Sequence, residues 1–301
     1  MSLFGRCIFG RVFSSGGGEQ LINKKTVLTI LLGLFLILSA LPVSAGPSLK
    51  PATVKNPVMN EPVRQVIVPE QAAGNSPALV PLGLAIDDGQ IVEGYAVIHY
   101  KRKRASDRQR AASTGTTCYR FLAKGARWKI TEPYVVDPTN SDGLSSTFVR
   151  STVATGLETW DSRVSFEVFG LEDLVSTVNG VDTVAPDGKN EILFGNISDT
   201  NAIAVATVWG IFYGPTSGRK LVEYDVIFDD PDYTWGDASL NAAVMDFQNI
   251  FTHELGHGAG LSDLYDTNCG EETMYGYANA GETKKRDLNT GDIAGIRALY
   301  R

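Results

Sequence analysis

Apolar residues recur at helical spacing in three segments of the second half of the chain. In residues 144–162 they stand at Phe148, Val149, Val153, Leu157 and Trp160, which predicts an amphipathic helix. Residues 239–260 predict a longer helix that is entered through an N-cap at Asp237 or Ser239 and ended by glycines. Residues 290–300 predict a last helix that closes the chain.

Short runs of β-branched and aromatic residues lie between these helices and predict strands. The predicted strands are 129–137, 164–170, 191–197, 202–214 and 220–230. Further upstream, residues 89–100 alternate between apolar and polar positions and predict one or two strands. His99 falls inside that alternation and is interpreted as an ordinary strand residue.

The first 117 residues have a different character. Lys24 and Lys25 precede an apolar stretch and a small-residue site that ends at Ala45, so residues 1–45 are predicted to be a secretory signal peptide. An uncleaved membrane anchor is the alternative. Residues 46–117 contain a proline-rich linker and are predicted to be a leader or propeptide, with a cleavable basic stretch at 101–110. Residues 118–301 then form the main domain.

The net charge and the cysteine content limit the classes of function that the chain can have. A net charge of −7 argues against nucleic-acid binding, because phosphate recognition needs a basic face. Outside the signal peptide the chain has two cysteines, Cys118 and Cys269, and an exported chain would most simply join them in a disulfide. The alternative is that Cys118 blocks a metal site in a latent form. Nothing in the sequence predicts an oligomeric state.

The segment FTHELGHGAGLSDLYD, residues 251–266, carries the candidate chemistry. His253 and His257 are one helical turn apart, so their side chains leave the same face, and Glu254 stands beside the first of them. H-E-x-x-H in this setting supplies two zinc ligands and a general base. Asp263 follows a glycine turn and is the favoured third ligand, with Asp266 as the weaker alternative.

H-E-L-G-H-G-A-G-L-S-D resembles the extended zinc signature of the metzincins, in the variant that ends in aspartate. ETMYGYA supplies Met274 for the methionine turn of that group, and LNTGDIAGIRALY is similar to the last helix of the matrixin branch. The resemblance covers about residues 128–300. It implies an α+β, zincin-like fold: a twisted, mostly parallel sheet with an antiparallel edge strand, a long active-site helix and a C-terminal helix. It also implies that Met274 lies beneath the histidines.

The chain departs from the matrixin pattern around its last predicted strand. Ile227 stands where a histidine ligand of the family's structural zinc is expected, so that second zinc is expected to be absent. Asp229 and Asp232 fall near a family calcium site, and an acidic turn without an ion is the equal alternative.

The resemblance implies a secreted endopeptidase with one catalytic zinc, which hydrolyses peptide bonds by a zinc-bound water with Glu254 as general base. Its substrate would be a protein or peptide lying extended along the edge strand 202–214, and the alternative is that this strand is covered and only structural. After signal cleavage no membrane attachment is expected. The alternatives are a non-catalytic binding or surface protein on the same fold, or a zinc hydrolase of small molecules. An open cleft with a free strand edge would favour a peptide substrate.

Overall fold

The computed structural model describes residues 65–66, 79–101 and 117–301. The predicted signal peptide and most of the predicted leader lie outside these ranges. The strands are β1 (Gln65–Val66), β2 (Leu79–Asp87), β3 (Gln90–Lys101), β4 (Glu132–Val136), β5 (Phe169–Glu172), β6 (Glu191–Ile197), β7 (Ala202–Ile211), β8 (Lys220–Asp229), β9 (Trp235–Gly236), β10 (Met245–Asp246) and β11 (Tyr277–Ala278). The α-helices are α1 (Ser146–Asp161), α2 (Phe247–Gly258) and α3 (Thr290–Leu299), with short 3-10 turns at η3 (Thr216–Gly218), η4 (Thr267–Cys269) and η5 (Lys284–Arg286).

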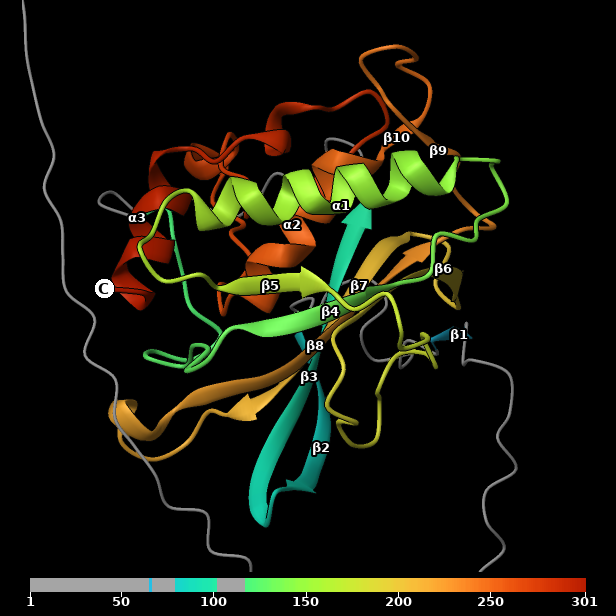
Figure 1. The fold of residues 1–301 in the computed structure, drawn as a ribbon. Coiled ribbons are helices and arrows are strands. Elements are labelled where there is room, and N and C mark those ends of the chain that lie inside the picture. Colours follow the sequence, from blue (N-terminus) through green and yellow to red (C-terminus); the bar gives the residue numbers. More distant parts are fainter. Residues whose placement is uncertain (1–64, 67–78, 102–116) are drawn as a thin grey trace, which may run out of the picture. The chain divides into compact units, whose positions relative to one another are not determined.

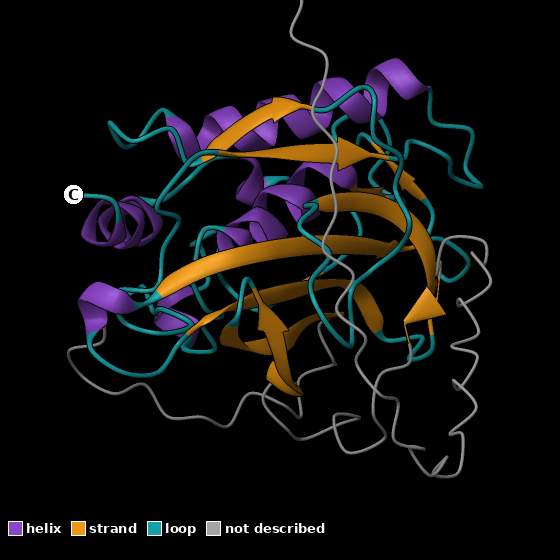
Figure 2. Cartoon of the chain, turned by 60° about the horizontal axis from the view of Figure 1, so that its bottom comes forward, coloured by secondary structure: helices purple, strands orange, loops and turns teal. Residues whose placement is uncertain are grey.

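One mixed sheet organises the described residues, in the order β11-β3-β7-β8-β6-β4-β5. The strands β5, β4, β6 and β8 run parallel, and β7 runs antiparallel to β8. The strands are strongly curved, as expected for a twisted sheet (Figure 2). This arrangement confirms the predicted α+β fold class.

The antiparallel side of the sheet is wider than the sequence predicted. The expected strand in residues 89–100 exists as β3, and it pairs with β7 from Glu93↔Gly210 to Tyr100↔Ala202. β2 pairs with β3 in turn, and β11 pairs with its other end. The predicted leader therefore contributes three strands to the same sheet as the main domain, namely β2, β3 and the short β1, which pairs in parallel with β6.

The helices α1 and α2 lie side by side over one face of the sheet (Figure 1). Gly156 of α1 permits this approach, because a Cβ there would lie 2.7 Å from the ring of Phe251 in α2. The indole Nε1 of Trp160 also donates to the carbonyl of Thr252 at 2.8 Å. This contact fixes the helix that carries the histidines against the rest of the core.

The predicted start of the active-site helix was too early. Helix α2 begins at Phe247, and Asp246 is its N-cap, accepting a hydrogen bond from the backbone N–H of Asn249 at 2.8 Å. Met245 and Asp246 belong to β10, which pairs with β9 and holds the preceding residues out of the helix. The early aspartate, Asp237, instead forms an ion pair with Arg286. None of the described helices has the length and apolar character needed to cross a bilayer.

Candidate metal centre and active site

Helix α2 presents His253 and His257 on one face, and both side chains are fully buried. His253 Nδ1 lies 2.7 Å from the carbonyl oxygen of Thr273, and His257 Nδ1 lies 3.0 Å from that of Leu261. A carbonyl oxygen can only accept, so each Nδ1 carries the ring proton and each Nε2 keeps its lone pair. Both rings are thus fixed in the tautomer and orientation that a metal ligand needs.

A glycine turn brings Asp263 to these rings. The helix ends at Gly258, and Gly260 has a φ of +99°, a region that L side chains rarely adopt. A Cβ at Gly260 would also lie 2.8 Å from the carbonyl oxygen of Ala126. Beyond the turn, Asp263 Oδ1 lies 3.2 Å from His253 Nε2 and 3.5 Å from His257 Nε2. The weaker candidate Asp266 caps the 3-10 turn η4 instead.

The three converging atoms fit a cation. His253 Nε2, His257 Nε2 and Asp263 Oδ1 are buried and have no hydrogen-bond partner. Three atoms with only lone pairs to offer repel one another, and buried polar atoms without partners are unfavourable. Two imidazole nitrogens and a carboxylate oxygen form a donor set suited to zinc, and three protein ligands leave the fourth position open, as in catalytic sites.

The protonation states of His253 and Asp263 agree with this ligand set, whereas for His257 burial would lower the pKa but the neighbouring carboxylate of Asp263 raises it. Burial, followed by the charge of Lys285, lowers the pKa of His253 to about 3, which keeps its ring neutral. Burial by itself would raise the pKa of Asp263, but the neighbouring His257 and His253 hold it well below its usual range. Burial raises the pKa of Glu254 to about 8. A carboxylate with a pKa near neutrality is suited to proton transfer.

Met274 lies beneath the metal site, as the resemblance implied. A Cβ on Gly256, between the two histidines, would lie 2.1 Å from the sulfur of Met274. The carboxylate of Asp292 at the start of α3 accepts hydrogen bonds from the backbone N–H groups of Thr273 and Met274, at 2.6 and 3.1 Å. The last helix therefore holds the methionine turn, which in turn supplies the Thr273 carbonyl to His253.

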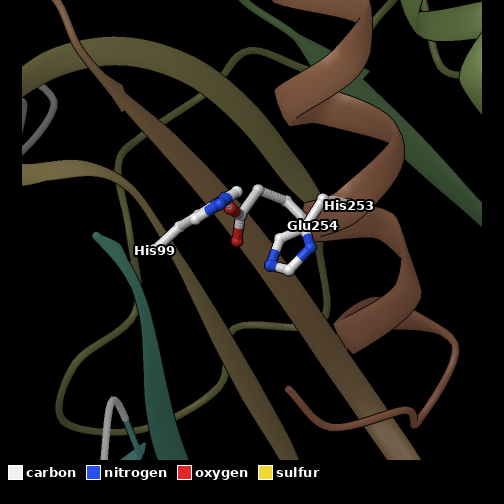
Figure 3. A group of neighbouring side chains, drawn as sticks. All are labelled: His99, His253 and Glu254. Atoms are coloured by element: carbon white, nitrogen blue, oxygen red, sulfur yellow. Dashed lines mark hydrogen bonds and ion pairs between the residues drawn. The ribbon is translucent and has the colours of Figure 1, made fainter. Parts of the chain in front are cut away.

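His99 also lies at this site, although the sequence indicated an ordinary strand residue. His99 Nδ1 lies 2.9 Å from Glu254 Oε1, and the ring of His99 lies 3.9 Å from that of His253 (Figure 3). Lys285 Nζ is 3.1 Å from His99 Nε2, so the ammonium donates to Nε2 and Nδ1–H donates to Glu254. No sequence spacing reveals this contact, since 155 residues separate His99 from Glu254.

The structure brings the two predicted disulfide cysteines together, but within the part of the chain that it describes it does not form a metal-ligand group around the predicted calcium residues. Cys118 and Cys269 are joined in a disulfide, the pairing that the sequence favoured. Asp229 is buried next to the exposed Asp232, but the two belong to no group of three potential metal ligands among the described residues. Ile227 is fully buried in an apolar cluster.

Comparison with known proteins agrees with this geometry. Residues 127–301 match the family model of the matrixins. Over 188 residues the chain is 24% identical to Metalloendoproteinase 1-MMP of Arabidopsis thaliana, a match that covers 62% of this chain and 47% of that protein. The chain thus spans about half the length of this relative. Because the family model matches more than half of the chain and includes the metal site, the chain belongs to the matrixin family of metalloproteases.

Proposed function

We propose that this protein is a secreted, zinc-dependent endopeptidase with Glu254 as its general base. The observation that carries the proposal is the convergence of three buried, unpartnered ligand atoms, on His253, His257 and Asp263, next to Glu254. Membership of the matrixin family supports the same reaction class.

The protein groups have separate roles in this proposal. A zinc ion held by the three ligands would supply Lewis-acid polarisation of a peptide carbonyl and would acidify a water molecule. Glu254 Oε1 is occupied by His99, while its Oε2 is buried without a partner. The carboxylate of Glu254 takes the proton of the attacking water and returns it to the leaving amine.

The location and the calcium site are also proposals. Removal of residues 1–45 would release the chain outside the cell, and the Cys118–Cys269 disulfide is typical of exported proteins. Tethering through an uncleaved N-terminal segment is the alternative. Calcium binding at Asp229 and Asp232 would need further ligands from solvent or backbone.

Cleavage profiling of a peptide library tests the reaction. Residues 46–301 are loaded with zinc and assayed before and after brief trypsin treatment, which targets the basic stretch at 101–110. Glu254→Ala is treated identically. Cuts by the native chain that are absent from Glu254→Ala would support the endopeptidase. No cuts from either form, with one zinc per chain, would be expected of a latent precursor or of a non-catalytic binding protein, and no cuts from a variant in which β3 is weakened would favour the latter.

A further inference from the structure

The strand β3 lies across the place where an extended substrate is expected. It runs antiparallel along β7, the strand predicted to receive the peptide, over eight residue pairs from Glu93 to Tyr100. Its end also pairs in parallel with β11, through Tyr100↔Tyr277 and Lys101↔Ala278. β11 follows the methionine turn by a few residues. β3 therefore occupies the hydrogen-bonding edges on both sides of the metal site.

His99 of β3 lies directly against the residues of the metal site. Its imidazole donates to Glu254 and packs against His253 (Figure 3). The side chains of His253, Glu254 and His257 are fully buried, and Asp263 is only 5% exposed. A peptide carbonyl has no access to Glu254 while β3 is in this position.

Other residues of β3 are also closely packed in this position. Val92, Ala96 and Ile98 are buried. Gly94 lies against the indole of Trp209 in β7, and a Cβ there would lie 2.6 Å from ring atom Cη2. Trp209 has little freedom to move, because it is fully buried and its Nε1 donates to the carbonyl of Asp182. The match extends over several residues and is not a single contact at His99.

We propose that β3 is a built-in occupant of the substrate site, which keeps the enzyme latent until the strand is displaced. This inference rests on the proposed function, since it concerns access to the same metal site. Strand addition to β7 and β11 is available to only one partner at a time, so a peptide must compete with β3. The apparent affinity for a peptide then falls in proportion to the small fraction of molecules in which β3 has left.

The test weakens β3 without altering the catalytic residues. Gly94→Leu in residues 46–301 places a side chain against Trp209, while Gly218→Leu, a glycine with no atom within 4 Å of an added Cβ, is the matched control. His99→Ala is a second variant that removes the contact to Glu254. Two quantities are measured on the zinc-loaded proteins: the binding of a fluorescent peptide hydroxamate by anisotropy, and the hydrolysis of a peptide.

We expect Gly94→Leu and His99→Ala to bind the hydroxamate at least about tenfold more tightly than the native chain and Gly218→Leu. Equal binding by all four proteins would overturn the occlusion by β3, whatever their hydrolysis rates. Tighter binding by the variants without hydrolysis would support the occlusion and count against the proposed endopeptidase. If Gly94→Leu does not fold, the His99→Ala comparison decides alone.

A second inference comes from the opposite face of the sheet. Residues 173–190, between β5 and β6, cover carboxylates that project from the sheet. Glu223 Oε2 accepts from the backbone N–H groups of Asp187 and Gly188 at 2.7 and 2.5 Å. Asp225 accepts from the backbone N–H of Asp182 at 2.9 Å. This segment thus brings its own aspartates next to Glu223.

Asp182, Asp187 and Glu223 each place one carboxylate oxygen within 4.8 Å of those of the other two. Glu223 is fully buried, and its second oxygen, Oε1, has no hydrogen-bond partner. The nearby ammonium of Lys189 pairs with Asp187 at 2.8 Å and lies 3.8 Å from Glu191. The single positive charge of Lys189 does not neutralise the negative charge of this group of carboxylates.

We infer that Asp182, Asp187 and Glu223 bind a calcium ion. Calcium takes about six to eight oxygen ligands in flexible geometry, whereas magnesium usually keeps several waters and binds only one or two carboxylates, so three neighbouring carboxylates favour calcium. Asp187 is exposed, so the ion can enter from solvent and exchange. The ion would fix residues 173–190 to β8, far along the sequence from the metal ligands of α2.

Calcium titration of the zinc-loaded chain, followed by calorimetry and thermal unfolding, tests this site. We expect calcium to raise the Tm, by mass action on the folded state, and the double variant Asp182→Asn/Asp187→Asn to weaken binding at least about tenfold. Asp173→Asn in the same segment is the matched control, because its carboxylate is used by the backbone of Val175 and Ser176. Asp232→Asn separates this ion from one at Asp229. No calcium binding, or binding lost only in Asp232→Asn, would overturn the assignment, and a proton shared between the carboxylates would then explain the cluster.

Discussion

Two clusters of buried polar side chains lie on opposite sides of the sheet at β8, and different parts of the chain fix their side chains. The histidine cluster stands on one helix, and its rings are fixed from behind by the carbonyls of Thr273 and Leu261. The carboxylate cluster at Glu223 is covered by a long connection whose backbone N–H groups point into it. Fixed rings give a metal site the rigid geometry that catalysis needs, while a flexible set of oxygens suits an ion that secures a loop.

The largest predicted effect separates the clusters by function. In the Gly94→Leu chain, Glu254→Gln should lower peptide hydrolysis by about 10²- to 10⁴-fold, because general base catalysis is lost while the ligands remain. Asp182→Asn in the same background should change the rate by less than about twofold. Hydrolysis rates and zinc content by mass spectrometry check both. A comparable loss in the two variants would show that the faces are not independent.

The disulfide should stabilise the histidine side of the molecule. Cys269 lies between Asp263 and Met274, and its bond to Cys118 closes a loop of 151 residues. Cys118→Ser/Cys269→Ser should lower the free energy of unfolding by about 2–5 kcal/mol. Urea unfolding at fixed zinc and calcium concentrations measures it. A change below about 1 kcal/mol would indicate that the core alone holds this segment.

The packing beneath the histidines can be disturbed by one methyl group. Gly256→Ala places a Cβ 2.1 Å from the Met274 sulfur, and we expect a loss of about 1–3 kcal/mol together with lower zinc occupancy. Gly218→Ala, where the added Cβ meets nothing within 4 Å, is the control. Thermal unfolding and zinc content report the two effects. Normal zinc occupancy in Gly256→Ala would mean that the methionine turn does not position the ligands.

A half-buried carboxylate outside both clusters gives the smallest effect and a reference for them. Burial raises the pKa of Asp161 to about 6, against the hydrogen bonds that it accepts from the backbone of Val168 and Phe169. Because the folded-state pKa is raised, its stabilisation is present below about pH 4 and is lost as the pH rises through 6. The free energy of unfolding of Asp161→Asn, relative to that of the native chain, should therefore increase by roughly 1 kcal/mol as the pH rises from 4 to 8. Parallel stability curves for the two proteins across that range would contradict the shift.

The histidine cluster was predictable because most of it is local. His253, Glu254 and His257 lie on one helix, and Gly260 needs only a short turn to bring Asp263 back. The strands β3, β4, β6, β7 and β8 were also readable from their residue pattern, whereas β5 begins at Phe169 and not at residue 164, and β2 and the two-residue strands were not predicted. The helix start was not, because Asp237 and Asp246 are both good caps, and the pairing of β9 with β10 decides between them.

The contacts of His99 and of the carboxylate cluster, unlike the Cys118–Cys269 disulfide, were out of reach of the sequence. His99 looks like any strand residue until β3 is placed next to β7, and Lys285 then completes its hydrogen bonds. The meeting of Asp182, Asp187 and Glu223 depends on the path of a connection that has no regular period. In both cases the chemistry comes from tertiary placement, which single-sequence patterns do not contain.

The position of β11 has a consequence for recognition. In the described sheet, β11 pairs with β3 and with no other strand. When β3 leaves, Tyr277 and Ala278 lose their connection to β7, and the two hydrogen-bonding edges that β3 joined are separate. A peptide that enters then rejoins them as a new central strand. Selectivity would depend partly on how well a sequence adopts extended backbone, so a proline at a paired position should make a poor substrate even where its side chain fits.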